Sequence, residues 1–457
     1  MKTQRKNPYS IIAVFLIIGV CLWQITNIGK YSKNAVIADD IISYYAYLPA
    51  TFIEKDYKLQ FNIRDENGKY RYWPDTAPNG GFVIKTSMGM AIMYSPFFFI
   101  AHQCAEKMGY KADGFTTPYA FALMHSCLLY LCMGLIFLRR LLLKYFKDNI
   151  VTITLLIIGL ATNLHWYVYK EGPMSHGHSF ALFCVLLFLI EKWQEKQSWM
   201  TSIFIGLIIG LISLIRPTNG LVVILFLFYN ITTLKDIRAR IQLFLKNYPK
   251  IITMLVCAVL VWLPQLLYWK SVTGTWLYYS YGTNERFFFD NPHLLSVLFG
   301  FRKGWLIYTP VMIFALIGIG MLWKNNKKYF YPTVLFLITN IYVVSCWWCW
   351  WYGGGFGMRA LIECYAVLAI PLATFLTWMV KQKLPAKIPL LIIFVAITTL
   401  SVFHTFRYHF GTIHYDAMTK EAYFHSFWRV RSNKEFKSLL IDPDYKAARK
   451  GEKEQSK

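Results

Sequence analysis

The chain has 457 residues, of which 56% are hydrophobic, 18% aromatic and only 16% charged. A soluble globular domain usually carries about 25% charged residues, so this composition excludes an ordinary soluble enzyme. The formal net charge is +24, but no basic patch lies on a recognisable soluble module, and nucleic-acid binding is therefore not predicted.

The apolar residues fall in long blocks, and the first block, residues 11–28, is long enough to cross a bilayer, which takes about 20 residues. Basic clusters between blocks are typical of cytoplasmic loops. Placing all of these clusters on the inner side predicts an all-α polytopic membrane protein with eleven spans. The spans are predicted at residues 10–28, 116–138, 150–168, 176–190, 200–215, 218–231, 251–269, 305–323, 329–346, 361–380 and 388–404.

One more apolar block, residues 88–102, does not fit this count. If it crossed the membrane, the basic cluster that begins at Arg139 would lie outside. The block is therefore predicted to be a juxtamembrane or re-entrant helix on the outer side, broken near Pro96.

The predicted threading places nearly all unusual polar residues on one face. It implies a transmembrane domain over residues 1–404, whose large outer loop is residues 29–115, and a basic tail over residues 405–457 on the outer face. The expected location is the plasma (inner) membrane, with a functional site that faces outward.

Two adjacent carboxylates stand in the first outer loop, in the stretch "VIADDIISYYAYLPATF". A helix there would place Asp40, Tyr44 and Tyr47 on one face, with Asp39 just before them. One interpretation is a helix N-terminus, where Asp is favoured by capping and by the helix dipole. That explains one aspartate better than two, so a catalytic acid pair is the competing interpretation.

Several cations lie on the same predicted face. Lys85 precedes a helix start, where it could hold a phosphate or extend to the lipid headgroups. Arg216, Arg302 and Arg359 each stand next to an apolar span. An ionisable residue at the membrane edge is a candidate functional residue, and these cations could bind a phosphate opposite the two carboxylates.

The stretch "YKEGPMSHGHSF" contributes Glu171, His176 and His178. Their spacing matches no strong zinc motif, so a divalent metal is possible but not supported, and polar contacts to a substrate are predicted instead. Aromatic residues such as Tyr44 and Trp351 could stack on a sugar ring. Acids, cations and aromatics together on a membrane surface fit a lipid-linked phosphosugar.

With these motifs the sequence resembles the GT-C integral-membrane glycosyltransferases, which use polyprenyl-phosphate sugars and include protein O-mannosyltransferases and the aminoarabinose transferase of lipid A. The resemblance covers the order of motifs over roughly residues 10–380. It is carried by "ADDIISYYAYLPA" after the first span, "KTSMGMAIMYSPFF", "RPTN", "RKGWLIYTP" and "WWYGGGFGMRALIE". The second motif has the family's Lys but lacks its two prolines.

The resemblance implies inverting transfer of a sugar from a polyprenyl-phosphate donor to a glycan, lipid or protein acceptor. Asp39 and Asp40 would occupy the acidic catalytic position, and either could be the general base. Arg359, with Lys85, Arg216 and Arg302, would stabilise the departing lipid phosphate. No further cofactor is implied.

Two other functions share some of these features. A flippase or transporter of a lipid-linked sugar would use the same cations and aromatics. It would not need a carboxylate pair, and it would more often show internal repeats and polar residues within spans. A non-catalytic membrane scaffold would leave the clustering on one face unexplained.

Overall fold

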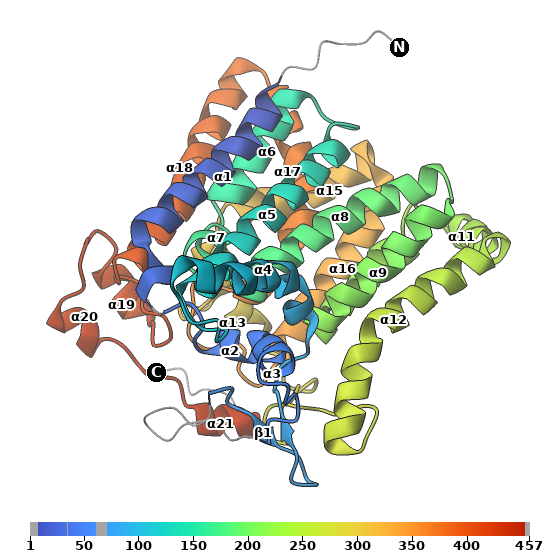
Figure 1. Cartoon of the computed structure of the whole chain (residues 1–457). Coiled ribbons are helices and arrows are strands. Elements are labelled where there is room, and N and C mark those ends of the chain that lie inside the picture. Colours follow the sequence, from blue (N-terminus) through green and yellow to red (C-terminus); the bar gives the residue numbers. More distant parts are fainter. Residues whose placement is uncertain (1–7, 34, 61–70, 453–457) are drawn as a thin grey trace.

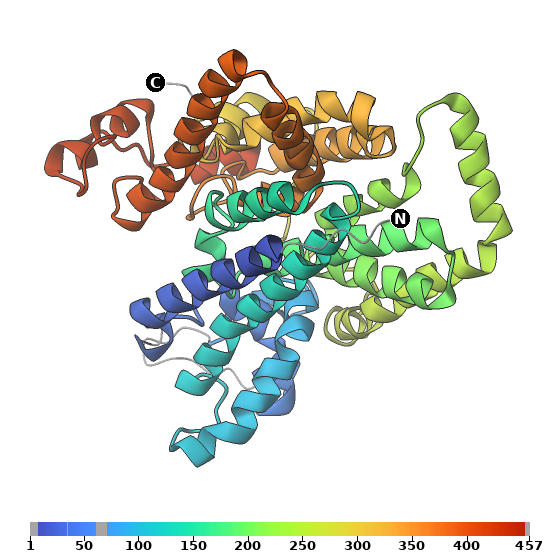
Figure 2. The same cartoon turned by 90° about the horizontal axis from the view of Figure 1, so that it is seen from above.

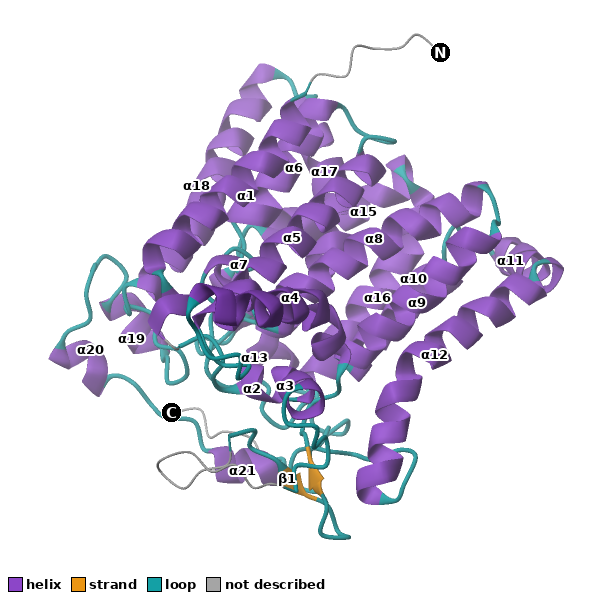
Figure 3. Ribbon diagram, viewed as in Figure 1, coloured by secondary structure: helices purple, strands orange, loops and turns teal. Residues whose placement is uncertain are grey.

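The computed structural model describes residues 8–33, 35–60 and 71–452. Helices dominate this part of the chain, and its only strands are the short antiparallel pair β1 (Asp75–Thr76) and β2 (Phe82–Val83). Figure 3 shows the strands at one edge of a large helical body. The all-α prediction is confirmed for the described residues.

Long apolar helices form the body of the molecule, and they lie side by side in the two views of Figures 1 and 2. Their bounds are α1 (Tyr9–Ile28), α5 (Thr117–Leu142), α6 (Asp148–Leu160), α8 (Ser175–Glu195), α9 (Trp199–Ile215), α12 (Tyr248–Thr273), α15 (Met312–Asn325), α16 (Lys327–Ser345), α17 (Cys364–Val380) and α18 (Leu384–His409).

Shorter helices connect the long ones or cover their ends. They are η1 (Lys30–Lys33), α2 (Asp40–Tyr45), α3 (Tyr47–Phe52), α4 (Gly89–Ala105), η2 (Glu106–Met108), α7 (Trp166–Tyr169), η3 (Pro217–Val222), α10 (Val223–Leu227), α11 (Leu234–Lys246), α13 (Leu294–Phe299), α14 (Trp305–Tyr308), η4 (Arg359–Leu361), α19 (Lys420–His425), α20 (Lys434–Ser438) and α21 (Tyr445–Lys450).

Within the described residues, four helical segments are long and apolar enough to cross a membrane, namely α1 with η1, α5, α12 and α18. Most side chains of α12 and α18 are not covered by protein. Apolar surface of this extent is stable next to lipid and not next to water. The chain is thus a multi-pass membrane protein, whereas the count of eleven spans stays a prediction.

Three predicted spans are not continuous helices. Residues 150–168 divide into α6 and α7, 218–231 is only η3 followed by α10, and 305–323 divides into α14 and α15. Asn163 and Pro310 lie at two of these interruptions. The side chain of Asn163 bonds to Phe356 and Tyr365, far along the chain, and proline has no N–H to continue a helix.

The expected break at Pro96 is absent, because α4 runs through it as one helix. Proline at this position cannot donate a hydrogen bond to the carbonyl of Ile92. The hydroxyl of Ser95 donates to that carbonyl instead, at 2.8 Å. The prediction of a break was therefore wrong, since a neighbouring side chain satisfies the acceptor that proline leaves open.

The helical bundle has two opposite ends, which differ in the side chains that meet there. At one end Arg139 donates to Ser10 Oγ at 2.6 Å, and Ser10 also contacts Asp148. Glu191 lies at this end too, bonded to the hydroxyls of Tyr145, Tyr229 and Tyr329 and to Lys328.

We call this the basic end, because the predicted inner clusters of the described chain meet here. The first of those clusters, residues 2–6, lies outside the described residues. That the basic end faces the cytoplasm remains a prediction.

The other end carries α2, α3, the strands and α21 (Figure 1). We call it the site end. The described part of the tail folds back onto it, because Arg302 donates to the carbonyls of Asp416 and Ile441 at 2.6 and 3.1 Å. The tail therefore helps to build the surface of the site end.

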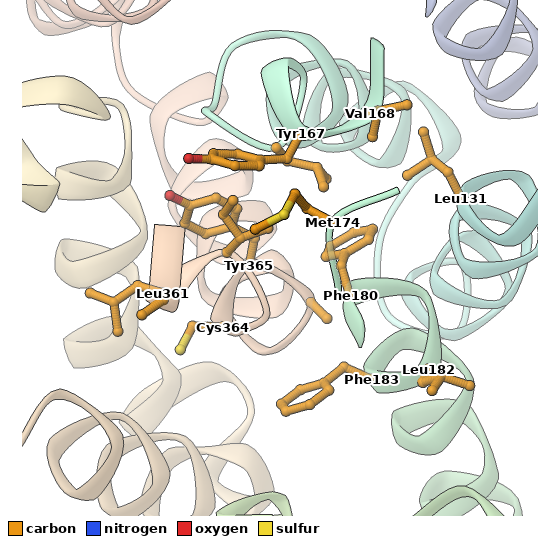
Figure 4. Close-up of a cluster of buried hydrophobic side chains, with 14 of the residues drawn as sticks. Leu131, Tyr167, Val168, Met174, Phe180, Leu182, Phe183, Leu361, Cys364 and Tyr365 are labelled. Carbon is orange, nitrogen blue, oxygen red and sulfur yellow. The ribbon is translucent and has the colours of Figure 1, made fainter. Parts of the chain in front are cut away.

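Buried aromatic and aliphatic side chains join the two halves of the bundle beneath the site end. Figure 4 shows Tyr167 of α7 beside Tyr365 of α17, with Met174 and Phe180 below them. These four side chains are all buried. The packing gives the segments above it a rigid base.

Candidate active site at the site end of the bundle

The acidic pair begins α2. Asp40 is its first residue, and Asp39 occupies the N-cap position, but the side chain of Asp39 makes no capping hydrogen bond. Both aspartates are exposed. The capping explanation of Asp39 therefore has no support in the geometry.

The backbone of Asp39 has φ 50° and ψ −134°. A residue with a Cβ reaches this region only with strain, which costs about 1–3 kcal/mol. Strain of this kind concentrates at functional sites, where surrounding structure holds it. The strained turn directs the chain into α2, whose first residue is Asp40.

Asp40 contacts Arg359, which lies 319 positions later in the chain. Asp40 Oδ2 is 3.3 Å from Arg359 Nη2. The carboxylate side chain is 51% exposed and the arginine side chain only 14%, so the arginine presents its charge from a largely buried position. Its Nε is buried and has no hydrogen-bond partner among the described residues.

Electrostatics around Arg359 keep it charged. Burial alone would lower the pKa of Arg359, but the Asp40 carboxylate and the hydroxyls of Tyr167 and Tyr44 outweigh burial and raise the pKa above its usual value. The guanidinium is thus a permanent cation at the edge of the bundle, with one side open toward the surface at Asp40.

A second arginine lies close by. Arg216 follows the last residue of α9. Burial acts to lower the pKa of Arg216, but Tyr44 and Glu363 outweigh burial and raise it. The charge of Arg359 acts in the opposite direction, to lower the pKa of Arg216. An anion beside them would relieve their mutual repulsion.

His176 and Glu363 form a buried pair, and the charges of Arg216 and Arg359 both act on His176. His176 Nδ1 and Glu363 Oε1 are 3.1 Å apart, and both side chains are almost fully enclosed. The second atoms of each group, His176 Nε2 and Glu363 Oε2, are buried with no partner in the described chain. Unsatisfied polar atoms are rare in protein interiors, so this pair is a candidate for contact with a bound group or for orienting Arg216.

Hydrogen bonds to backbone atoms hold the loop that carries Arg359 in place. Tyr352 has φ 58°, and Gly355 has φ 156°. The N–H of Phe356 donates to the Tyr167 hydroxyl at 2.9 Å, and Asn163 donates to the carbonyl of Phe356 at 3.4 Å. These contacts fix the loop against α7 and the α6–α7 connection.

A buried lysine completes this support. Lys303 donates to the carbonyls of Gly355 and Tyr415, and it is 1% exposed. Burial, together with the nearby Arg359, lowers the pKa of Lys303 to about 7. A neutral amine still has two N–H groups for two carbonyls, so Lys303 links the loop to the tail rather than offering a charge to a ligand.

Replacing Gly355 with alanine should disturb the site from within the loop. The new Cβ would lie 2.5 Å from the Tyr167 hydroxyl, at a φ that favours glycine. We expect a loss of about 1–3 kcal/mol in stability, measured as a lower thermal unfolding midpoint in detergent.

The control is Gly320→Ala in α15, where a Cβ would meet no atom within 4 Å. Combining Gly355→Ala with Tyr167→Phe removes the clashing oxygen, so the double variant should lose less than the two single losses combined. A Gly355→Ala protein as stable as Gly320→Ala would contradict this account of the loop.

Not all predicted site residues join this group. Asp40 contacts Arg359, and His176 pairs with Glu363. Arg216 and Tyr44 act on these groups through their charges. Lys85 instead pairs with Glu285 at 3.0 Å, in a separate pocket. Its carboxylate partner makes Lys85 a poor site for the phosphate assigned to it from the sequence.

The other predicted residues have structural partners. Glu171 pairs with Lys30 at 3.0 Å. His178 is fully buried, with Nε2 3.0 Å from Ser126 Oγ, so its imidazole is enclosed by protein. These placements offer no support for substrate contacts by Glu171 or His178.

Arg302 and Trp351 both contact residues of the C-terminal tail. Arg302 donates to tail carbonyls, as described above, and it lies 5.6 Å from the ring of Trp351. Trp351 is 2% exposed and packs against Tyr445 of α21. Neither residue is placed beside Asp40 by any contact in the described chain.

Asn163 and Tyr167 support the site, yet the sequence did not point to either of them, and Lys303 stood out only as a cation beside a span, not as a support. Asn163 was an available signal, because a polar amide inside an apolar stretch needs hydrogen-bond partners. Tyr167 and Lys303 act through backbone atoms of a distant loop, and no local pattern reveals such contacts.

The arrangement offers cations that can bind an anion and a carboxylate that can accept a proton. Arg359 and Arg216 supply the cations, and Asp40 supplies the carboxylate. Among residues 8–33, 35–60 and 71–452, no three His, Cys, Asp or Glu side chains converge as ligands for a metal ion.

Comparisons with known proteins find similarity among solved structures only. No protein-family model matches the chain, and no curated protein matches it. Among solved structures, the chain is similar to the apo crystal structure of an oligosaccharyltransferase from Archaeoglobus fulgidus, with a TM-score of 0.49 and 12% identity. The match covers 97% of this chain and 61% of that protein, so the chain spans less than two thirds of its length.

Proposed function

We propose that the protein is a membrane glycosyltransferase that moves a sugar from a polyprenyl-phosphate donor to an acceptor on the outer face. The observation that carries the proposal is the contact between Asp40 and Arg359, with Arg216 beside it, at one end of an apolar helical bundle. A lipid-phosphate sugar presents its phosphate at the membrane surface, which is the depth expected for these groups.

In the proposed reaction, Asp40 takes the proton of the acceptor hydroxyl or amine. The acceptor atom forms a bond to the anomeric carbon as the bond from that carbon to the phosphate oxygen breaks. The electron pair remains on the polyprenyl phosphate, whose added charge Arg359 and Arg216 stabilise. Attack from the side opposite the leaving group inverts the anomeric carbon.

The ion pair between Asp40 and Arg359 links the binding of the donor phosphate to the removal of the acceptor proton. A donor phosphate that bonds to Arg359 weakens the hold of the guanidinium on Asp40. A carboxylate oxygen that no longer contacts the guanidinium is free to accept a hydrogen bond from the acceptor. Donor binding would thus prepare Asp40 for the acceptor, and Asp39 would act by setting the strained entry into α2.

The test uses purified protein in liposomes with a radiolabelled polyprenyl-phosphate sugar and a panel of glycan, lipid and peptide acceptors. We expect acceptor-dependent release of free polyprenyl phosphate. A flippase would move the intact donor between leaflets without cleaving it. Movement without cleavage, for every donor and acceptor tried, would replace the transferase by that alternative.

The same assay tests the outward orientation. Membrane vesicles of both orientations receive a water-soluble, short-chain donor and a membrane-impermeant acceptor. Release in right-side-out vesicles, with little in inverted ones, is expected if the site end faces outward. The reverse result would place the site on the cytoplasmic face.

A further inference from the structure

We infer that a pocket beneath the β1–β2 hairpin binds the acceptor, and that the acceptor group it takes is an uncharged sugar ring. The inference rests on the proposed function, which it extends from the donor to the second substrate. Four observations carry it: the pocket itself, the balance of its charges, its contacts toward the segment that carries Asp40, and the hydrogen bonds that hold its walls in place.

The pocket has a volume of about 260 Å³. Pockets that enclose drug-sized ligands measure roughly 300–1,000 Å³, so this one suits a smaller group, such as one ring of a glycan. Its wall includes Asp75, Lys85, Tyr281, Asn284, Glu285 and Arg449.

The charges of the pocket are paired with one another. Glu285 lies 3.0 Å from Lys85 and 3.7 Å from Arg449. Burial raises the pKa of Asp75, Lys85 lowers it in part, and Glu285 raises it further. Two acids and two cations therefore share one small space.

This balance selects against charged ligands. An anionic ligand would meet Asp75 and Glu285, and a cationic ligand would meet Lys85 and Arg449. Sugar hydroxyls, in contrast, both donate and accept hydrogen bonds, so they can bond to carboxylates, ammonium groups and the Asn284 amide alike.

Two contacts relate the pocket to the segment that carries Asp40. Lys85 Nζ is 5.3 Å from the centre of the Tyr281 ring on the pocket side. The carbonyl of Thr86, the next residue, accepts a hydrogen bond at 2.7 Å from the hydroxyl of Tyr47, at the start of α3 after α2. Burial raises the pKa of Tyr281, and smaller effects come from Tyr44, Arg216, Asp40 and Glu285. The same ring thus lies within electrostatic reach of the proposed base and of the pocket carboxylate, and it offers a flat face for a sugar.

The pocket is built from segments that hold each other in place. Asn79 donates to the carbonyl of Val272 at 2.9 Å, and Gly81 approaches that carbonyl so closely that a Cβ would lie 2.4 Å from it. The Ser280 hydroxyl donates to the carbonyl of Lys85. Arg449 comes from α21, and the tail therefore completes the pocket.

The test measures binding of free methyl glycosides by saturation-transfer NMR, without any donor. The probes are methyl glucoside and methyl mannoside, with glucuronate as the anion and glucosamine as the cation. Wild-type protein should bind the uncharged glycosides best. Glu285→Gln should weaken the binding of these glycosides about tenfold. It should also shift the preference toward glucuronate, because the positive charges of Lys85 and Arg449 are then less neutralised.

Arg449→Gln should shift the preference toward glucosamine, and its exposed position makes it a second variant expected to fold. Glu195→Gln is the matched control, since Glu195 also pairs with a lysine, Lys144, at 2.6 Å, but at the basic end. Equal sugar affinities in Glu285→Gln, Arg449→Gln and Glu195→Gln would overturn the pocket assignment. Preferential binding of a charged sugar by wild-type protein would overturn the ligand class.

The donor assay separates this inference from the proposed function. Binding of uncharged glycosides, with no cleavage of any donor, would sustain the pocket and reject the transferase. Donor turnover that depends only on peptide or charged acceptors, without binding of uncharged glycosides, would sustain the transferase and reject the sugar pocket.

Discussion

Asp40→Asn is expected to reduce turnover by about 10²–10⁴-fold, the usual contribution of a general base. Asparagine is nearly the same size as aspartate and can still accept a hydrogen bond from Arg359, but it cannot take the acceptor proton. Binding of the donor should change little. Turnover is measured as polyprenyl phosphate released per minute, and donor affinity by equilibrium binding of the labelled donor.

The companion variant Asp39→Asn identifies the base. Asp39 is the strained residue before α2, and no side-chain contact of Asp39 places it at Arg359 in the described structure. Its substitution should therefore reduce turnover less than Asp40→Asn does. The opposite order would make Asp39 the base, and near-normal turnover in both variants would end the catalytic role of the acidic pair.

Stability gives a check on the same variants. The contact between Asp40 and Arg359 involves a half-exposed carboxylate, and such pairs contribute about 0–1 kcal/mol. The unfolding midpoint of Asp40→Asn should thus stay close to that of wild type. A large fall in stability would mean that lost turnover reports unfolding rather than lost proton transfer.

Arg359→Ala should weaken donor binding by about tenfold or more. A hydrogen bond to a charged group contributes about 1.5–3 kcal/mol. The largely buried guanidinium of Arg359 has an Nε without a partner in the described chain, and a phosphate oxygen would accept a hydrogen bond from it. Donor affinity is measured with the intact labelled polyprenyl-phosphate sugar, and with a donor analogue that lacks the phosphate.

The analogue without phosphate should bind Arg359→Ala and wild type alike, because the lost contact is to phosphate. Arg359→Lys keeps the charge but not the planar pair of donors, so it should fall between alanine and wild type. Arg238→Ala on α11, an exposed arginine at a distance from the site, is the control. Unchanged donor affinity in a folded Arg359→Ala protein would remove this residue from the site.

The sequence by itself determined the class of architecture. A long apolar block inside a membrane can satisfy the hydrogen bonds of its backbone only by forming a helix. The observed helices α1, α5, α12 and α18 follow the predicted spans closely. The sequence also indicated that Asp40, Arg216 and Arg359 belong to one face, because basic clusters set the direction of each crossing.

Tertiary structure alone decided which of these charges meet. Asp40 finds Arg359 across 319 positions, while Lys85 finds Glu285 and Arg302 finds tail carbonyls. A helix period predicts neighbours three or four residues away, but it carries no information about partners on distant loops. Those partners are chosen by how the helices pack and where the tail returns, and this packing is why Arg359 contacts Asp40 whereas Lys85 and Arg302 have other partners.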